Sequence, residues 1–126
     1  MSLSSTAAND IANYICRGTA PTTLATPIKI SLHTADPGAT GASESTGGSY
    51  ARQTAGYNTA SGGACALAAT LNFTGMPAST VTHIGIWDST GTPKFLQGAA
   101  LASSKTLGAG DTLALTAATD TVTGIG

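Results

Sequence analysis

The sequence predicts an all-β fold: an antiparallel β-sandwich, jelly-roll or immunoglobulin-like in type, with about seven to eight strands and one N-terminal helix. Three observations predict it. A helical period is confined to the start of the chain, apolar and polar residues alternate afterwards, and turn residues separate the alternating runs. We expect one domain, 1–126, with a helix over 4–17, a sandwich over 27–126 and a long loop over 35–49.

Residues Ser4–Arg17 are expected to form the helix, because apolar residues recur there at intervals of three and four. Ser4 or Ser5 suits the N-cap position, and Gly18 suits the position that ends the helix. The stretch Thr19–Pro27 is expected to be a linker, because its prolines do not allow a helix to continue.

The remainder of the chain contains runs that are typical of strands. In the run Thr80–Asp88, Ile84 and Ile86 are expected on one side and Val81, His83 and Trp87 on the other. The run Pro27–Thr34 is expected to bury one face only, since its apolar residues alternate with polar ones. The expected strands are Pro27–Thr34, Tyr50–Gly56, Ala64–Phe73, Thr80–Asp88, Lys94–Leu101, Asp111–Thr116 and Thr121–Ile125.

A loop with almost no large side chains separates the first two strands. Asp36 can accept backbone N–H groups, Pro37 fixes φ and Gly38 tolerates positive φ, so a tight turn is expected to begin it. A compact domain rarely keeps so long an irregular segment unless something binds or packs against it. We expect this loop and the helix to be binding elements, because neither is needed to complete a sandwich.

The chain is poor in charge. Charged residues make up 9% of it, against about 25% in an average soluble domain. Since the cores of protein interfaces are depleted in charge, the deficit favours a subunit packed against other proteins, although a monomer with a Thr- and Ser-rich surface is the alternative. The net charge is −1 and the five basic residues are scattered, which argues against binding to nucleic acid or to an anionic membrane.

Cysteine use and the N-terminus indicate neither secretion nor a membrane span. Cys16 and Cys65 lie far apart, and we expect two free thiols, with a disulfide as the alternative. No signal peptide is expected, because the start lacks basic residues and contains Asp10. No uninterrupted apolar run approaches the roughly 18 residues that a membrane helix requires.

Catalytic and metal-binding arrangements find little support. A triad could combine a serine with His33 or His83 and with Asp36 or Asp88, but two histidines among seven strands will usually lie near some acid. His33, Asp36 and Glu44 offer too few ligands in the wrong spacing for zinc or calcium. We therefore expect no catalytic residue, no metal and no cofactor.

Arg52, which follows Tyr50 closely, has two interpretations. It could contact a ligand, or it could hold the long loop through a carboxylate, either Glu44 or Asp36. A pair of acids for glycoside cleavage is not ruled out by spacing alone, yet no acid lies beside exposed aromatic residues of the kind that sugar clefts show.

Three blocks of sequence carry a resemblance to a known family. They are Ser31–Gly38 followed by Gly41, Glu44 and Gly47–Arg52; Val81–Asp88; and Ala102–Leu107 with Gly110–Thr112. These blocks resemble the signature of small structural proteins of tailed bacteriophages that are commonly labelled phage tail fibre proteins. The opening helix, which ends in Arg17-Gly18-Thr19-Ala20, is also similar to the family's usual start. The resemblance covers nearly the whole chain and implies a non-enzymatic virion component with a β-sandwich or jelly-roll-like body.

Two roles in the virion are open under this resemblance. The first is a capsid decoration (cement) protein, a homotrimer on the exterior of the head that bridges neighbouring capsomers and binds the major capsid protein. The second is a tail-fibre or baseplate component that contacts other tail proteins or a host surface glycan, with Tyr50, Arg52 and Tyr57 as the contacting cluster. A long fibre normally carries a repetitive shaft, and the absence of repeats in this chain favours the first role.

The residues expected to act fall into two groups. The expected assembly contacts are Leu3, Ile11, Tyr14, Ile15, Asp36, Glu44, Tyr50 and Arg52. The residues of the family motif, expected to have structural roles, are His33, Asp36, Pro37, Gly38, His83, Trp87 and Asp88.

Overall fold

The structure is a computed structural model that describes residues 2–21, 24–116 and 121–123. These residues form one helix, α1 (Ser5–Arg17), and nine mostly short strands. The expected all-β class with an N-terminal helix is confirmed, since all strand pairs are antiparallel. The strands are β1 (Ser2–Leu3), β2 (Lys29–His33), β3 (Gln53–Thr54), β4 (Ala64–Ala66), β5 (Leu71–Phe73), β6 (Ser79–Trp87), β7 (Phe95–Leu107), β8 (Leu113–Leu115) and β9 (Thr121–Thr123).

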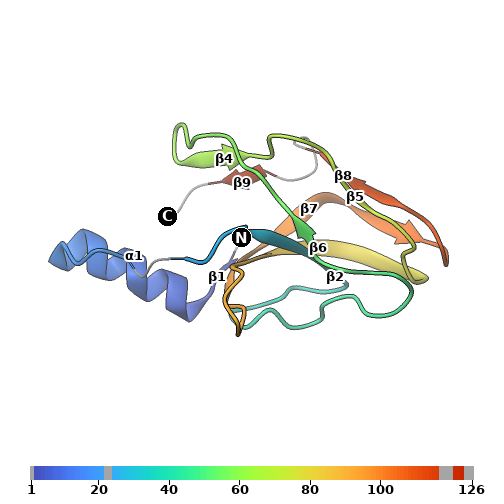
Figure 1. Cartoon of the computed structure of the whole chain (residues 1–126), viewed down its shortest axis with the longest axis horizontal. Coiled ribbons are helices and arrows are strands. Elements are labelled where there is room, and N and C mark those ends of the chain that lie inside the picture. Colours follow the sequence, from blue (N-terminus) through green and yellow to red (C-terminus); the bar gives the residue numbers. More distant parts are fainter. Residues whose placement is uncertain (1, 22–23, 117–120, 124–126) are drawn as a thin grey trace.

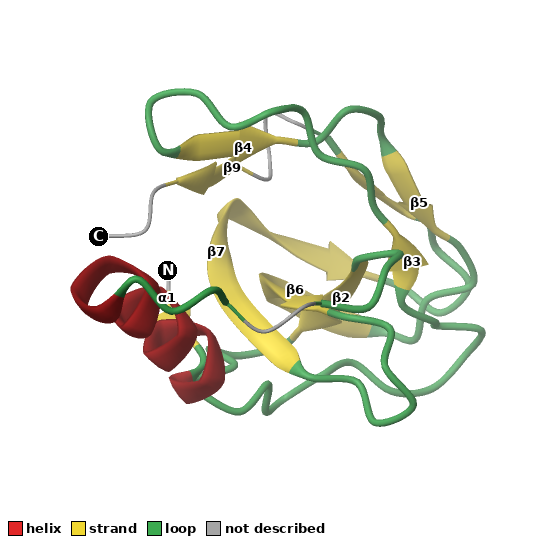
Figure 2. Ribbon diagram, turned by 60° about the vertical axis from the view of Figure 1, so that its left-hand side comes forward, coloured by secondary structure: helices red, strands yellow, loops and turns green. Residues whose placement is uncertain are grey.

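One five-stranded sheet dominates the body, with the order β1-β7-β6-β2-β3. Two separate ribbons, β4-β9 and β5-β8, lie over one of its faces and give the molecule its two layers (Figures 1 and 2). The long strands β6 and β7 form the middle of the sheet, and β2 pairs with β6 along all five of its residues.

The hydrophobic core lies between the five-stranded sheet and the β5-β8 ribbon. Ile30 and Leu32 of β2 and Ile84 of β6 face Phe73 and Leu115 from the β5-β8 ribbon, and all five are almost fully buried. The alternation predicted for the apolar residues of β2 is therefore confirmed for the side that faces the core.

The expectation that β2 buries only one face is wrong. Ser31 and His33, which alternate with the core residues, are also fully buried, because the loop over residues 35–49 covers the other face of the sheet. Pro37 of this loop is buried and packs so closely on β7 that a Cβ atom at Gly98 would lie 2.3 Å from its Cγ atom. The loop thus covers the outer face of the five-stranded sheet.

The expected strand Ala64–Phe73 is in fact two strands in different ribbons. Between them the chain leaves β4 and pairs loosely with residues 56–58, through the Ala68 N–H to Gly56 O hydrogen bond and an isolated bridge between Tyr57 and Leu67. Most residues of the run are alanines, which bury little apolar area, so their alternation does not force a continuous strand.

The expected sides of β6 are corrected at one residue. The pairing of β6 with β7 is irregular between Val81 and His83, because Val81 lies opposite Lys105 and His83 lies opposite Ala100, and this irregularity breaks the regular alternation of sides. As a result Val81 lies in the core with Ile84 and Ile86, while His83 keeps the opposite side with Trp87.

Other differences concern strand ends. β7 runs to Leu107, six residues beyond its expected end, although most residues of its second half are exposed and polar. β1, which the sequence did not predict, pairs Leu3 with Gln97. The expected last strand, Thr121–Ile125, is observed as β9, and its final two residues lie outside the described residues.

Helix α1 begins and ends as its sequence predicts. The Ser4 hydroxyl accepts a hydrogen bond from Ala7 N–H, and Gly18 adopts a left-handed conformation with φ 63° at the C-terminal end. The helix projects away from the strands (Figure 1), and none of its residues is buried. Within the described residues, no helix is both long enough and apolar enough to cross a membrane.

Candidate functional site

Backbone hydrogen bonds fasten the long loop to β2. Thr34 N–H donates to Ser43 O (3.0 Å), and Ser45 N–H donates to Leu32 O (2.8 Å). At the start of the loop the Asp36 carboxylate accepts Gly38 N–H at 2.8 Å, as the turn chemistry predicts. Asp36, expected also as an assembly contact, is exposed and holds this turn.

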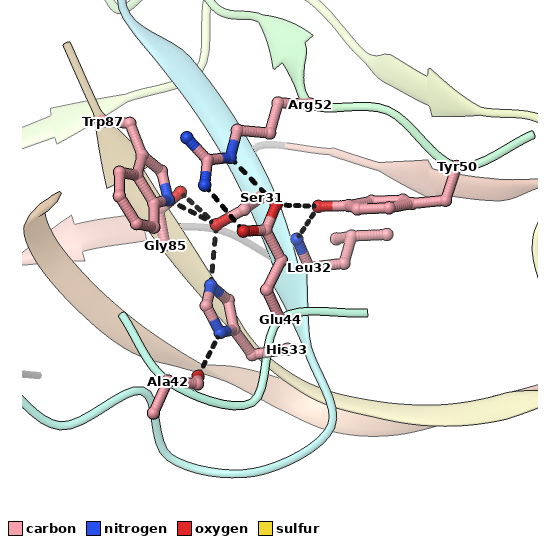
Figure 3. A network of polar contacts seen from close by, with 9 residues as sticks. All are labelled: Ser31, Leu32, His33, Ala42, Glu44, Tyr50, Arg52, Gly85 and Trp87. Atoms are coloured by element: carbon pink, nitrogen blue, oxygen red, sulfur yellow. Dashed lines mark hydrogen bonds and ion pairs between the residues drawn. The ribbon is translucent and has the colours of Figure 1, made fainter. Parts of the chain in front are cut away.

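Three of the expected site residues form a polar cluster, which we call the loop network: Glu44 of the loop, and Tyr50 and Arg52, which follow it in the chain (Figure 3). Arg52 binds Glu44 with two hydrogen bonds, Nε to Oε1 at 2.9 Å and the terminal nitrogen to Oε2 at 2.7 Å. Tyr50 donates its hydroxyl hydrogen to Glu44 Oε1 and accepts Leu32 N–H, both at 2.9 Å. Of the two acids considered for Arg52, Glu44 is therefore the one that it binds.

Aromatic contacts extend the loop network into the core and onto the sheet. The Tyr50 ring stacks on Phe73, with ring centroids 6.3 Å apart and an interplanar angle of 17°. The Arg52 guanidinium lies 3.6 Å from the centre of the Trp87 ring, a cation–π contact. These contacts give all three polar residues partners inside the molecule.

The electrostatics of the loop network favour a fixed ion pair. Burial raises the pKa of Glu44, but hydrogen bonds from Arg52 and Tyr50 outweigh it, so the net pKa lies below the usual value. Burial raises the pKa of the Tyr50 hydroxyl well above its usual value. Glu44 and Arg52 are thus charged and Tyr50 is neutral across the physiological pH range.

Beside the loop network, a buried chain of hydrogen bonds crosses β2 (Figure 3). Trp87 Nε1–H donates to Ser31 Oγ at 2.8 Å, and Ser31 Oγ lies 2.7 Å from His33 Nε2. His33 Nδ1 lies 2.7 Å from the Ala42 carbonyl oxygen, which can only accept. Nδ1 therefore carries the proton, and burial lowers the pKa of His33, which favours the neutral form. In that form Nε2 accepts the Ser31 hydroxyl, which also lies 3.4 Å from the Gly85 carbonyl oxygen.

This Ser31–His33 contact has the distance of a nucleophile and its base, but its surroundings differ from those of a catalytic pair. Both side chains are fully buried, and Nδ1 faces a backbone carbonyl where a triad has a carboxylate. The arrangement instead joins the loop at Ala42 to β2 and to β6 at Trp87.

Stability is expected to fall as the pH drops below 6.5, the reference pKa of His33, because burial lowers the pKa of this residue in the folded state. The unfolded chain then binds one proton more, so the free energy of unfolding falls by at most about 1.4 kcal/mol per pH unit. The pKa values of Glu44 and Asp88 are also lowered in the folded state, and these two residues reduce stability further only below about pH 4.5 and pH 3.8, their reference pKa values. Urea denaturation between pH 7.5 and about pH 5 measures the effect of His33 alone.

The matched variants for this test are His33→Gln and His83→Gln. We expect the first to remove the pH dependence above pH 5 and the second to keep it. Equal stability of the unaltered protein across this interval would contradict the assigned neutral, buried state of His33.

The remaining motif residues hold local structure. The Asp88 carboxylate accepts Lys94 N–H at 2.8 Å and the Thr90 hydroxyl at 3.0 Å, which closes the hairpin turn over 89–92. Hydrogen bonds, first that of Lys94 N–H, lower the pKa of Asp88 although burial acts to raise it. His83 Nδ1 lies 2.8 Å from the Thr82 hydroxyl oxygen. Cys16 and Cys65 are both free thiols.

The expected contacts on the helix lie in a different environment. Tyr14 and Ile15 are 60% and 73% exposed, whereas Ile11 and Leu3 are partly covered. Ile11 lines a cavity of about 170 Å³ between the helix and the body, together with Leu24 and Leu96. Leu24 was not among the expected contacts, although a leucine within a proline-bounded linker, where no regular element can bury it, is itself a signal of an exposed apolar residue.

A second cavity, of about 220 Å³, continues from the first. It shares Leu24 and Leu96 with it and extends past Ile28, Tyr57 and Ile86. Tyr57, which was considered for a glycan-binding cluster with Tyr50 and Arg52, lines this cavity instead. Nearly all lining atoms of both cavities are apolar, so we call the two together the apolar groove.

Among the described residues, no group of three His, Cys, Asp or Glu side chains lies close enough to hold a metal ion. The site is therefore best described by two features: a loop fixed by internal polar contacts, and an apolar groove beside a projecting helix.

Comparison with known proteins assigns the class. The chain matches the model of a protein family over residues 2–123, and the description of this family names a phage fibre protein. The class is thus a structural protein of a bacteriophage virion. The chain belongs to the family described as podophage GP4 fiber I protein gp80. No curated protein matches the sequence.

Proposed function

We propose that this protein is a non-enzymatic subunit of a phage tail fibre, placed on the exterior of the virion. The observation that carries the proposal is the family match, which covers nearly the whole chain and bears the description of a fibre protein. This description favours the second of the two roles considered above over the first, the capsid decoration protein, for which the match gives no support.

The polar groups at the candidate site support a structural role. Glu44, Tyr50 and Arg52 each contact other groups of the same chain, and the Ser31–His33 contact is buried beneath the loop. The outer surface offers apolar contact instead, at the exposed residues of α1 and in the apolar groove. Burial of apolar surface stabilises a contact between two proteins by about 25 cal/mol for each Å² removed from water.

Intact virions test the proposal. Gold-labelled antibodies against this protein are expected to bind the tail or its fibres in electron micrographs. Quantitative mass spectrometry is expected to find far fewer copies than of the major capsid protein. Labelling of the head surface, with copies in proportion to the capsid subunits, would establish the decoration role and overturn the fibre proposal.

A further inference from the structure

The Ser31 hydroxyl lies at the centre of the buried chain of hydrogen bonds that crosses β2 (Figure 3). Its oxygen is within reach of three partners: Trp87 Nε1 at 2.8 Å, His33 Nε2 at 2.7 Å and the Gly85 carbonyl oxygen at 3.4 Å. A hydroxyl group donates one hydrogen bond and accepts two. The three partners therefore use its whole capacity when two of them donate and one accepts.

Two of these partners have fixed roles, and the third does not. The Trp87 indole nitrogen can only donate, and the Gly85 carbonyl oxygen can only accept. His33 Nε2 accepts in the neutral imidazole and donates in the imidazolium. In the neutral form the Ser31 hydrogen points to Nε2, and one lone pair of the Ser31 oxygen stays unused.

Protonation of His33 requires one rearrangement of hydrogens. A proton from solvent adds to Nε2, and the new N–H group donates to the unused lone pair of Ser31 Oγ. The Ser31 hydrogen turns about the Cβ–Oγ bond and points to Gly85 O. No other covalent bond forms or breaks, and no heavy atom has to move. Nδ1 keeps its proton and its hydrogen bond to Ala42 O in both forms.

The backbone of β2 and β6 places these groups close together. Ser31 lies directly opposite Gly85 in the strand pairing. A Cβ atom at Gly85 would lie 2.5 Å from Ser31 Oγ and 2.6 Å from His33 Nε2. The glycine thus leaves the space that both side chains occupy, and it brings its carbonyl group within reach of the hydroxyl.

We propose that Ser31 is a two-way hydrogen-bond relay, which keeps the loop over residues 35–49 bound to the sheet in both protonation states of His33. The acid form reverses one hydrogen bond inside the molecule and preserves the contact with Ala42, which holds the loop. The relay concerns the folded chain itself and does not depend on the place of the protein in the virion.

The charged groups that act on His33 come from three segments. Glu44 of the loop favours the protonated form, whereas Arg52 and His83 disfavour it. From β7 the Phe95 ring faces His33, with ring centroids 6.4 Å apart. Burial is the largest influence and lowers the pKa of His33. The charge therefore still costs free energy, as the expected pH dependence of stability requires, and the relay limits this cost by giving Nε2–H an acceptor.

Nuclear magnetic resonance of the purified full chain, from pH 7.5 down to about pH 4, tests the relay. Trp87 is the only tryptophan, so its indole N–H gives a single signal. We expect the His33 ring to titrate while the chain stays folded, and the Trp87 signal to shift with the same midpoint. The Thr34 and Ser45 amides, which fasten the loop, are expected to keep their protection from exchange. His83→Gln identifies the His33 signals.

Ser31→Ala separates the relay from the electric field of a charged His33, which also acts on Trp87. The variant is expected to bind the proton at His33 about tenfold more weakly, because Nε2–H loses a charge-assisted hydrogen bond. Its Trp87 signal is expected to lose most of the shift. Ser45→Ala is the matched control, since Ser45 is also buried but its hydroxyl has no partner among the described residues. We expect this control to titrate as the unaltered protein does.

Three results would overturn the proposal. In the first, the Thr34 and Ser45 amides lose their protection at the midpoint of His33, which means that the loop leaves the sheet on protonation. In the second, the His33 ring stays neutral until the chain unfolds. In the third, Ser31→Ala and Ser45→Ala titrate alike. The first two are measured on the unaltered protein, so they decide the question even where Ser31→Ala does not fold.

Discussion

Replacement of Gly85 by alanine is expected to lower the free energy of unfolding by about 1–3 kcal/mol, because the new methyl group overpacks a buried site. A Cβ atom at this position in β6 would lie 2.5 Å from Ser31 Oγ and 2.6 Å from His33 Nε2. Both atoms are held by hydrogen bonds that fix the loop to the sheet, so neither can move without breaking a buried contact. Urea denaturation measures the change.

Gly91→Ala is the matched control. A Cβ atom at Gly91, in the turn after β6, would have no heavy atom within 4 Å, and this glycine does not require positive φ. The substitution is expected to leave stability unchanged or to raise it by about 0.4–1 kcal/mol through the unfolded chain. Equal effects of the two substitutions would contradict the close packing of the Ser31–His33 contact beneath β6.

The largest loss is expected for Phe73→Ala, at about 3–5 kcal/mol. Phe73 is 1% exposed, belongs to the core between β5 and the five-stranded sheet, and stacks on Tyr50. The substitution therefore removes core volume and also the support of the ring whose hydroxyl binds Leu32 and Glu44. Thermal or urea denaturation gives the loss of stability.

Hydrogen exchange tests the second part of this prediction. The amide of Leu32, which donates to Tyr50, is expected to exchange faster in Phe73→Ala than the overall loss of stability accounts for. The control is Asn72→Ala in the same strand, an exposed position where a change within about ±0.5 kcal/mol is expected. Unchanged protection of Leu32 would show that Tyr50 holds its place without Phe73.

The elements that could be predicted from the sequence are those whose signals are local. Helix α1 is one, because Ser4 and Gly18 supply both ends and the apolar period lies between them. The turn at Asp36 is another, because its carboxylate bonds a backbone N–H two residues later. In each case the interacting groups are neighbours in the chain, so a short window of sequence contains the whole interaction.

The second buried face of β2 could not be predicted in this way. Ser31 and His33 alternate with apolar residues, a pattern that favours exposure to water, and their burial depends on Trp87 and on the Ala42 carbonyl. Fifty-six positions separate Ser31 from Trp87. Polar residues at such positions are buried only when distant partners satisfy them, and a single sequence does not show which partners meet.

The candidate site was predicted unevenly for the same reason. Tyr14 and Ile15 are exposed on the helix, as a contact surface requires, whereas Glu44, Tyr50 and Arg52 contact one another and the body. Head and tail locations could not be separated from composition, because a surface poor in charge suits protein contacts of either kind.

The polar contacts of the long loop also protect the open side of β2. Strand β3 pairs with only Lys29 and Ile30, so the outer N–H and C=O groups of the next residues would be available to a strand from another molecule. The Tyr50 hydroxyl occupies Leu32 N–H, and Ser45 N–H occupies Leu32 O. A substitution that removes the Tyr50 side chain would therefore favour aggregation of concentrated protein, because a strand from another molecule could add to the unpaired edge of β2.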